Sequence, residues 1–182
     1  MAYKSHLILI GLMGVGKSTI GRQLASCVGT TFIDTDHVIE DEQQSSISDL
    51  FEQHGEAYFR QLEKKALHKL VHESHQYVIA TGGGMVIQKQ NRDCMQQHGV
   101  VIWLNVEPEA IYQRVRGNKN RPLLQQTDAL RKLQDLYVQR EAWYRSCCDL
   151  EIKSGSLTPR QVVDQITQFM AEFRHEKATI SS

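Results

Sequence analysis

The sequence GLMGVGKST, residues 11–19, decides the fold class of this chain. It has the spacing G-x-x-x-x-G-K-[ST], in which the backbone N–H groups of a glycine-rich loop point at phosphate oxygens. The apolar run HLILI (6–10) predicts a buried strand before the loop, and a helical pattern over 17–28 follows it. A strand, this loop and a helix, in that order, are the context in which the motif binds a nucleoside triphosphate.

Each part of the loop has an expected role at the triphosphate. Lys17 is expected to reach the β- and γ-phosphates, and the Ser18 hydroxyl is expected to bind Mg²⁺. The helix that starts at the end of the loop adds the positive end of its dipole. The alternative is a glycine-rich turn with a chance Lys-Ser, which the preceding strand disfavours. The expected nucleotide-binding residues of the loop are Gly14, Val15, Gly16, Lys17, Ser18 and Thr19.

Short apolar runs alternate with helical patterns along the rest of the chain. The further runs, at 31–34, 77–81, 100–104 and 149–153, lack polar alternation, as is typical of parallel strands covered on both faces. Strands and helices in alternation predict a three-layer α/β domain, expected over 1–175. A tail, 176–182, is expected to fray after Arg174. Helices are expected to start near Ser46, Glu56, Pro108, Thr127 and Pro159.

Composition excludes several classes of protein. The 182 residues hold 21 Lys plus Arg and 21 Asp plus Glu, so no overall field favours nucleic acid or a membrane. The first apolar run is too short for a signal peptide or a membrane span. The four cysteines show no C-x-x-C pair, so reduced thiols and a cytoplasmic location are expected.

Two carboxylates, Asp34 and Asp36, follow the predicted strand 31–34 directly. Ligands bind at the carboxyl ends of strands in open α/β sheets, so both side chains are expected at the site. One carboxylate could hold the Mg²⁺ shell while the other orients a hydroxyl. The alternative is an aspartate that only caps a helix starting at His37.

Two glycine-containing segments are further candidates. Three consecutive glycines, 82–84, follow the strand 77–81 and indicate that backbone approaches another group closely, although a plain flexible turn is the alternative. The segment RVRGNKNR (114–121) carries four basic residues and no acidic one. It is typical of a loop that closes over phosphates, and the alternative is solvated surface charge.

These residues together resemble the shikimate kinase family. The resemblance is carried by GLMGVGKST, DTD (34–36), FR (59–60), TGGG (81–84), NRPLL (120–124) and Arg140 in YVQREAWY. It implies one P-loop kinase domain of the nucleoside-monophosphate-kinase type, with a five-stranded parallel sheet in the order 2-3-1-4-5. Acceptor-binding helices are implied at about 35–62 and a lid at about 114–127. It further implies ATP and Mg²⁺, shikimate as acceptor, a step toward chorismate and the aromatic amino acids, and a monomer.

The resemblance also implies the roles of single residues. Asp34 would be the outer-shell carboxylate of the metal, with Ser18. Asp36 would bind the ring hydroxyls of shikimate, either as a base or only orienting the attacking hydroxyl. The shikimate carboxylate would be held by Arg60 and Arg140, with backbone from Gly82, Gly83 and Gly84. Arg121 in the lid would reach the transferring phosphates, and Arg114 and Pro159 would flank the adenine.

Ordinary explanations exist for several of these residues. Arg60 could pair with Glu56 or Glu63 across one helical turn, and Arg140 has Asp135 and Glu141 nearby in sequence. The aromatic residues Trp103, Trp143 and Tyr144 are expected to be packing residues, although the last two could also form a wall of the acceptor pocket. A kinase of another polyol or sugar acid, such as gluconate, and a nucleotide-dependent switch without transfer activity are the competing functions.

Overall fold

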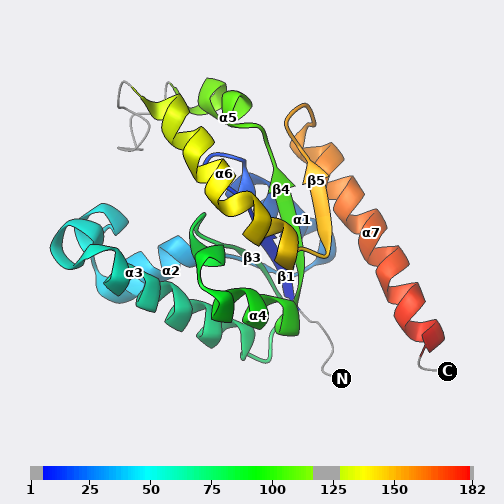
Figure 1. The fold of residues 1–182 in the computed structure, drawn as a ribbon. Helices are drawn as coiled ribbons and strands as arrows, with labels where there is room; N and C mark the ends of the chain where they lie inside the picture. The colour runs from blue at the N-terminus through cyan, green and yellow to red at the C-terminus, as the bar shows by residue number, and fades with distance from the viewer. Residues whose placement is uncertain (1–5, 117–127, 181–182) are drawn as a thin grey trace.

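The structure is a computed structural model that describes residues 6–116 and 128–180 (Figure 1). Its five strands form one parallel sheet in the order β2-β3-β1-β4-β5, as predicted. In this sheet Ile8 of the central strand lies opposite Ile79 on one side and Val101 on the other. The strands are β1 (His6–Ile10), β2 (Thr31–Asp34), β3 (Tyr77–Ala80), β4 (Gly99–Asn105) and β5 (Leu150–Lys153).

Helices cover both faces of the sheet, which confirms the three-layer architecture. Helices α1 and α7 pack against each other on one face, while α4 and α6 pack against each other on the other face (Figure 1). None of the described helices is long and apolar enough to cross a membrane. The helices are α1 (Lys17–Val28), α2 (Thr35–Gln43), α3 (Ile47–Val71), the 3₁₀ helix η1 (Met85–Ile87), α4 (Lys89–His98), α5 (Pro108–Val115), α6 (Ala129–Cys147) and α7 (Pro159–Ile180).

The hydrophobic core lies on the two central strands. Every residue of β1 and of β4 is buried, because helices cover these strands on both faces. Trp103 of β4 is 1% exposed, which confirms its prediction as a core residue. A second, smaller apolar cluster joins α2 to α3 through Ile39, Leu50, Phe59 and Ala66. The two helices therefore form a unit with its own packing beside the sheet.

Helix α3 is interrupted where the sequence predicted a new helical pattern. Gly55 has φ 78° and ψ 175° inside it, a left-handed backbone conformation that glycine adopts without a Cβ penalty. The segments before and after Gly55 are thus two helical pieces. The first starts after Ser46, whose hydroxyl accepts a hydrogen bond from the Asp49 N–H, so this predicted cap is confirmed.

Several predicted boundaries differ from the structure. Helix α2 begins at Thr35 instead of His37, because the Asp34 carboxylate caps it by accepting from the Asp36 N–H. Helix α7 starts at Pro159 as predicted but continues to Ile180, well beyond Arg174. Helix α6 begins after Asp128, and the predicted cap Thr127 lies outside the described residues. The helical segments η1 and α4, which follow the glycines 82–84, were not predicted.

A buried histidine makes the fold sensitive to acid. His6 is fully buried, the Tyr77 N–H donates to its Nδ1, and its Nε2 faces the Val71 carbonyl at 3.3 Å. A carbonyl can only accept, so the ring is neutral with its proton on Nε2. Burial lowers the pKa of His6 below its ordinary value. An unfolded chain takes up this proton near pH 6.5, so stability is retained above that pH and lost below it.

We therefore expect the free energy of unfolding to fall by up to about 1 kcal/mol more in the wild type than in His6→Gln when the pH drops from 7.5 to 5.5. Urea denaturation of both proteins at both pH values measures this difference, and the other histidines cancel in the comparison. Equal losses in the two proteins would show that His6 does not contribute.

Candidate active site

The phosphate loop has the backbone shape that the motif requires. Gly11, Gly14 and Gly16 all have left-handed φ angles, of 141°, 83° and 100°. A Cβ at Gly11 would lie 2.6 Å from the Leu104 carbonyl oxygen of β4, so only glycine fits there. The Lys17 ammonium donates to the carbonyls of Gly11 and Leu12 at 2.8 Å each. The loop and its lysine are thus held together in front of the N-terminus of α1, a favourable place for phosphate.

The pair Ser18 and Asp34 fits a magnesium site. The Ser18 hydroxyl donates to Asp34 Oδ2 at 2.7 Å, and the Asp36 N–H donates to Asp34 Oδ1 at 3.1 Å. Mg²⁺ takes oxygen ligands, keeps several waters and is typically held by one or two carboxylates together with substrate phosphates. A hydroxyl beside the phosphate loop with a carboxylate behind it provides oxygens of this kind. Asp34 therefore caps α2 and also supplies, together with Ser18, oxygens of the kind that Mg²⁺ binds.

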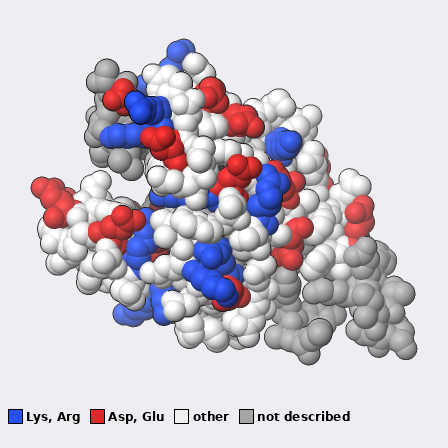
Figure 2. All heavy atoms as spheres, viewed as in Figure 1, with Lys and Arg blue, Asp and Glu red and all other residues white. Residues whose placement is uncertain are grey.

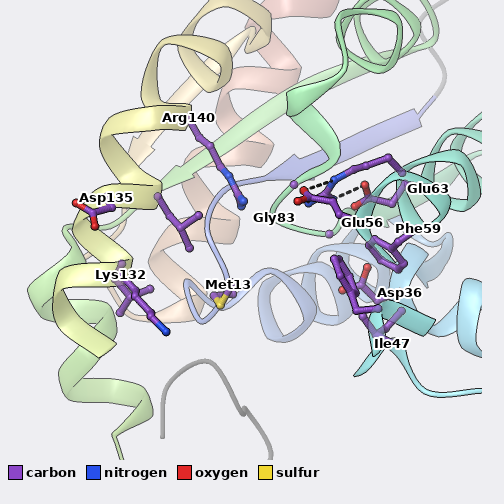
Figure 3. A pocket seen from close by; sticks show the side chains of 16 residues that line it. Met13, Asp36, Ile47, Glu56, Phe59, Glu63, Gly83, Lys132, Asp135 and Arg140 are labelled. Carbon is purple, nitrogen blue, oxygen red and sulfur yellow. Dashed lines mark hydrogen bonds and ion pairs between the residues drawn. The ribbon is translucent and has the colours of Figure 1, made fainter. Parts of the chain in front are cut away.

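A cavity of about 450 Å³ opens between the α2–α3 unit, the loop after β3 and helix α6. Asp36, Arg60 and Arg140 all line it, although they come from three different helices, and so does Met13 of the phosphate loop (Figure 3). Figure 2 shows the surface hollowed beside α3, with basic side chains at the inner end of the hollow. The residues predicted to bind the acceptor are therefore brought together beside the phosphate loop.

Arg60 has both its predicted ion pairs and a place in the cavity. Its Nη1 donates to Glu63 Oε2 at 2.6 Å, and its Nη2 donates to Glu56 Oε1 at 2.8 Å. A Cβ at Gly84 would lie 2.2 Å from Arg60 Nη1, so the guanidinium packs against the glycine backbone. Glu63 is itself 1% exposed. The arginine is therefore held in one orientation by a buried carboxylate.

Arg140 extends from α6 with its guanidinium directed into the cavity (Figure 3). It is only 8% exposed, and a charge this buried requires anionic or hydrogen-bonding partners. Its sequence neighbour Glu141 forms an ion pair with Arg145 at 2.9 Å. Arg140 thus presents a second cation to the same space as Arg60.

Asp36 carries a buried carboxylate oxygen without a hydrogen-bond partner among the described residues. This atom, Oδ1, and the similarly unpartnered Oε1 of Glu63 lie 2.7 and 2.9 Å from the point where a Cβ of Gly82 would stand. Burial and the neighbouring charge of Asp34 raise the pKa of Asp36, while Lys17 opposes this. Buried acceptors are nearly always satisfied, so these two oxygens are exceptions within the described part of the chain.

The glycines 82–84 connect the cavity to the phosphate loop. A Cβ at Gly83 would lie 3.3 Å from the Met13 backbone N and 3.5 Å from the Gly11 carbonyl oxygen. Other atoms approach the backbone closely at each of the three glycines, as predicted. A plain flexible turn would not require these contacts, so that alternative does not explain them. A ligand in the cavity would lie beside the backbone of the phosphate loop.

The residues predicted to flank the adenine meet at one loop. Arg114 Nη2 donates to the carbonyls of Ser154 and Gly155, at 3.4 and 2.6 Å, and this loop leads into Pro159 at the start of α7. Arg121 and positions 117–127 of the predicted lid lie outside the described residues.

Most of the apolar residues that line the cavity, and one of its cations, were not predicted from the sequence. Lys132 lines the cavity on α6, and the four-residue spacing of Lys132, Leu136 and Arg140 places all three on one helix face, a signal available in the sequence. No local signal marked the residues of the apolar wall as pocket residues, because their pattern is that of core packing. These residues are Met13, Ile47, Phe51, Phe59, Leu133 and Leu136.

Comparison with known proteins settles the family. A family model described as shikimate kinase matches residues 13–171. The chain belongs to the shikimate kinase family. A shikimate kinase of Thiobacillus denitrificans is 42% identical over 170 residues, covering 93% of this chain and 90% of that protein. One from Burkholderia lata is 39% identical over 162 residues, covering 89% and 88%. The family and the enzyme class predicted from the sequence are thereby confirmed.

Solved structures agree with the fold of this family. The shikimate kinase of Acinetobacter baumannii in complex with shikimate has a TM-score of 0.87 and 37% identity, covering 92% of this chain and 93% of that one. A gluconokinase from Sinorhizobium meliloti has a TM-score of 0.64 at 12% identity, which shows a shared fold alone.

Proposed function

We propose that this protein transfers the γ-phosphate of ATP to the 3-hydroxyl of shikimate, giving shikimate 3-phosphate and ADP in the route to chorismate and the aromatic amino acids. The observation that carries the proposal is that Arg60, Arg140 and Asp36 line one cavity that extends to Met13 of the phosphate loop. Arg60, Arg140 and Asp36 in one cavity match an acceptor with a carboxylate and several hydroxyls.

The cavity would orient shikimate from both ends. Arg60 and Arg140 would bind its carboxylate, since a guanidinium can donate two parallel hydrogen bonds to such a group. Asp36, which lines the cavity close to Gly82, would accept hydrogen bonds from ring hydroxyls. The attacking hydroxyl would then lie toward the phosphate loop.

The donor side would be built from the loop and its flanks. Backbone N–H groups of the loop, Lys17 and Ser18 would bind the phosphates, with Arg114 and Pro159 near the adenine and Arg121 reaching the transferring group. Ser18, with Asp34 behind it, would hold Mg²⁺, which would supply positive charge at the phosphates.

Transfer itself requires mainly alignment. The shikimate oxygen forms a bond to the γ-phosphorus, the bond from that phosphorus to the leaving oxygen of ADP breaks, and the hydroxyl proton passes to Asp36 or to solvent. The transition state is loose and its charge spreads over phosphate oxygens, so fixed cations and N–H donors contribute most of the catalysis.

Acceptor-dependent release of ADP tests the proposal. The protein is assayed with ATP and Mg²⁺ against shikimate, gluconate and nucleoside monophosphates, and phosphorus NMR identifies the product. We expect turnover with shikimate and a 3-phosphate product. Turnover with gluconate alone would show that gluconate, and not shikimate, is the acceptor. ATP binding without any acceptor-dependent ADP release would favour a switch protein. We also propose that the protein is a monomer in the cytoplasm and has no membrane or nucleic-acid partner.

A further inference from the structure

Tyr144 lies behind the acceptor cavity and is not among the residues that line it. It is 1% exposed, and its ring stacks on Trp103 of β4 with centroids 5.7 Å apart and planes 21° apart. Its hydroxyl donates to the Gly83 carbonyl oxygen at 2.6 Å. The side chain therefore joins the central sheet to the middle glycine of the loop after β3.

The same hydroxyl has a second neighbour in the predicted site. Arg140 precedes Tyr144 by four residues on α6, so the two side chains lie on the same helix face, and the Arg140 charge acts on the phenol. A tyrosine hydroxyl can donate one hydrogen bond and accept others, so it can serve Gly83 and Arg140 together. Burial raises the pKa of Tyr144, an effect that Arg140 only partly offsets, so the hydroxyl keeps its proton.

The hydroxyl thus connects the acceptor side to the donor side. Gly83 packs on the backbone of the phosphate loop at Met13 and Gly11, while Arg140 points into the acceptor cavity. The stack on Trp103 fixes the position of the phenol ring. A movement of the hydroxyl would displace the cation and the glycine loop relative to each other.

We propose that Tyr144 is a positioning residue for phosphoryl transfer. Its hydroxyl keeps the Arg140 guanidinium and the Gly83 carbonyl in a fixed position relative to the phosphate loop. The proposal rests on the function given above. The two expectations from the sequence were that Tyr144 packs in the core or forms a wall of the pocket. Neither of them includes this positioning role.

The test is Tyr144→Phe, which keeps the ring and its stack and removes only the hydroxyl. We expect the KM for shikimate to rise about tenfold, about 1.4 kcal/mol, because Arg140 and the glycine loop lose their common partner. The KM for ATP should change less than twofold. The matched control is Tyr137→Phe, on the same helix, whose hydroxyl donates to Asn105 Oδ1 at 3.2 Å. This control should leave both KM values within twofold of the wild type.

Urea denaturation of both variants separates positioning from stability. A rise in the KM for shikimate confined to Tyr144→Phe, at a similar loss of stability in the two variants, supports the proposal. An unchanged KM for shikimate in Tyr144→Phe, or equal rises for both substrates, would overturn it. A wild-type protein without shikimate-dependent turnover would instead refute the proposed function.

A second variant covers the case in which Tyr144→Phe does not fold. Trp103→Phe keeps the hydroxyl and weakens the stack that positions it. The expected result is a rise in the KM for shikimate of a few-fold with an unchanged KM for ATP. No rise in this variant would contradict the proposal.

Discussion

Replacement of Lys17 by alanine is expected to lower kcat by about 10²–10³-fold, which corresponds to about 3–4 kcal/mol of transition-state stabilisation. The ammonium is bound to the carbonyls of Gly11 and Leu12, so it is fixed at the phosphate loop before any nucleotide arrives. A preorganised charge of this kind contributes without reorganisation as negative charge moves onto the leaving phosphate oxygens. Alanine removes the charge and also releases the two carbonyls.

Steady-state release of ADP at saturating ATP and shikimate measures this loss. The control is Lys89→Ala, which removes an exposed lysine paired with Asp93 in the next turn of α4. Its kcat should match that of the wild type, because surface ion pairs of this kind contribute little. A Lys17→Ala protein that is folded, binds ATP and keeps kcat within tenfold of the wild type would show that Lys17 does not have the assigned role.

The fold was largely predictable because its decisive signals are local. The strand before GLMGVGKST and the apolar runs after it follow from side-chain pattern alone, and the strand order came from the family resemblance. Helix ends were less predictable, because they depend on single contacts. The Asp34 carboxylate reaches the Asp36 N–H and starts α2 two residues early, and nothing in the periodicity of the sequence shows where α7 ends.

The candidate site was predictable where the residues form contiguous motifs. Asp36, Arg60 and Arg140 were predicted from DTD, FR and the neighbourhood of YVQREAWY, and the structure places all three around one cavity. Tyr144 lies in that last motif too, yet its contact with Gly83 spans 61 positions of sequence and depends on how α6 packs on the sheet. A role that arises only from tertiary packing leaves no periodic or local signal.

Replacement of Asp36 by asparagine is expected to lower kcat by about 10²-fold and to raise the KM for shikimate. Asparagine keeps the shape of the side chain but can neither take up the hydroxyl proton nor attract hydroxyl donors as a charged group does. The difference acts at the carboxylate of Asp36, which lines the cavity beside Gly82. Both binding and rate should therefore fall, in contrast to the loss mainly in kcat expected for Lys17→Ala.

The dependence of kcat/KM on pH separates proton transfer from orientation at Asp36. Burial and Asp34 raise the pKa of Asp36, and a base works only when ionised, so wild-type kcat/KM should fall as the pH drops through that raised value. This fall of kcat/KM at low pH, the acid limb of the profile, should be absent from Asp36→Asn. It should be retained in Asp41→Asn, a control at an exposed position of the same helix. An Asp36→Asn protein that retains the acid limb would assign that limb to another group. Asp36 would then act by orienting the hydroxyl, with the proton leaving to solvent.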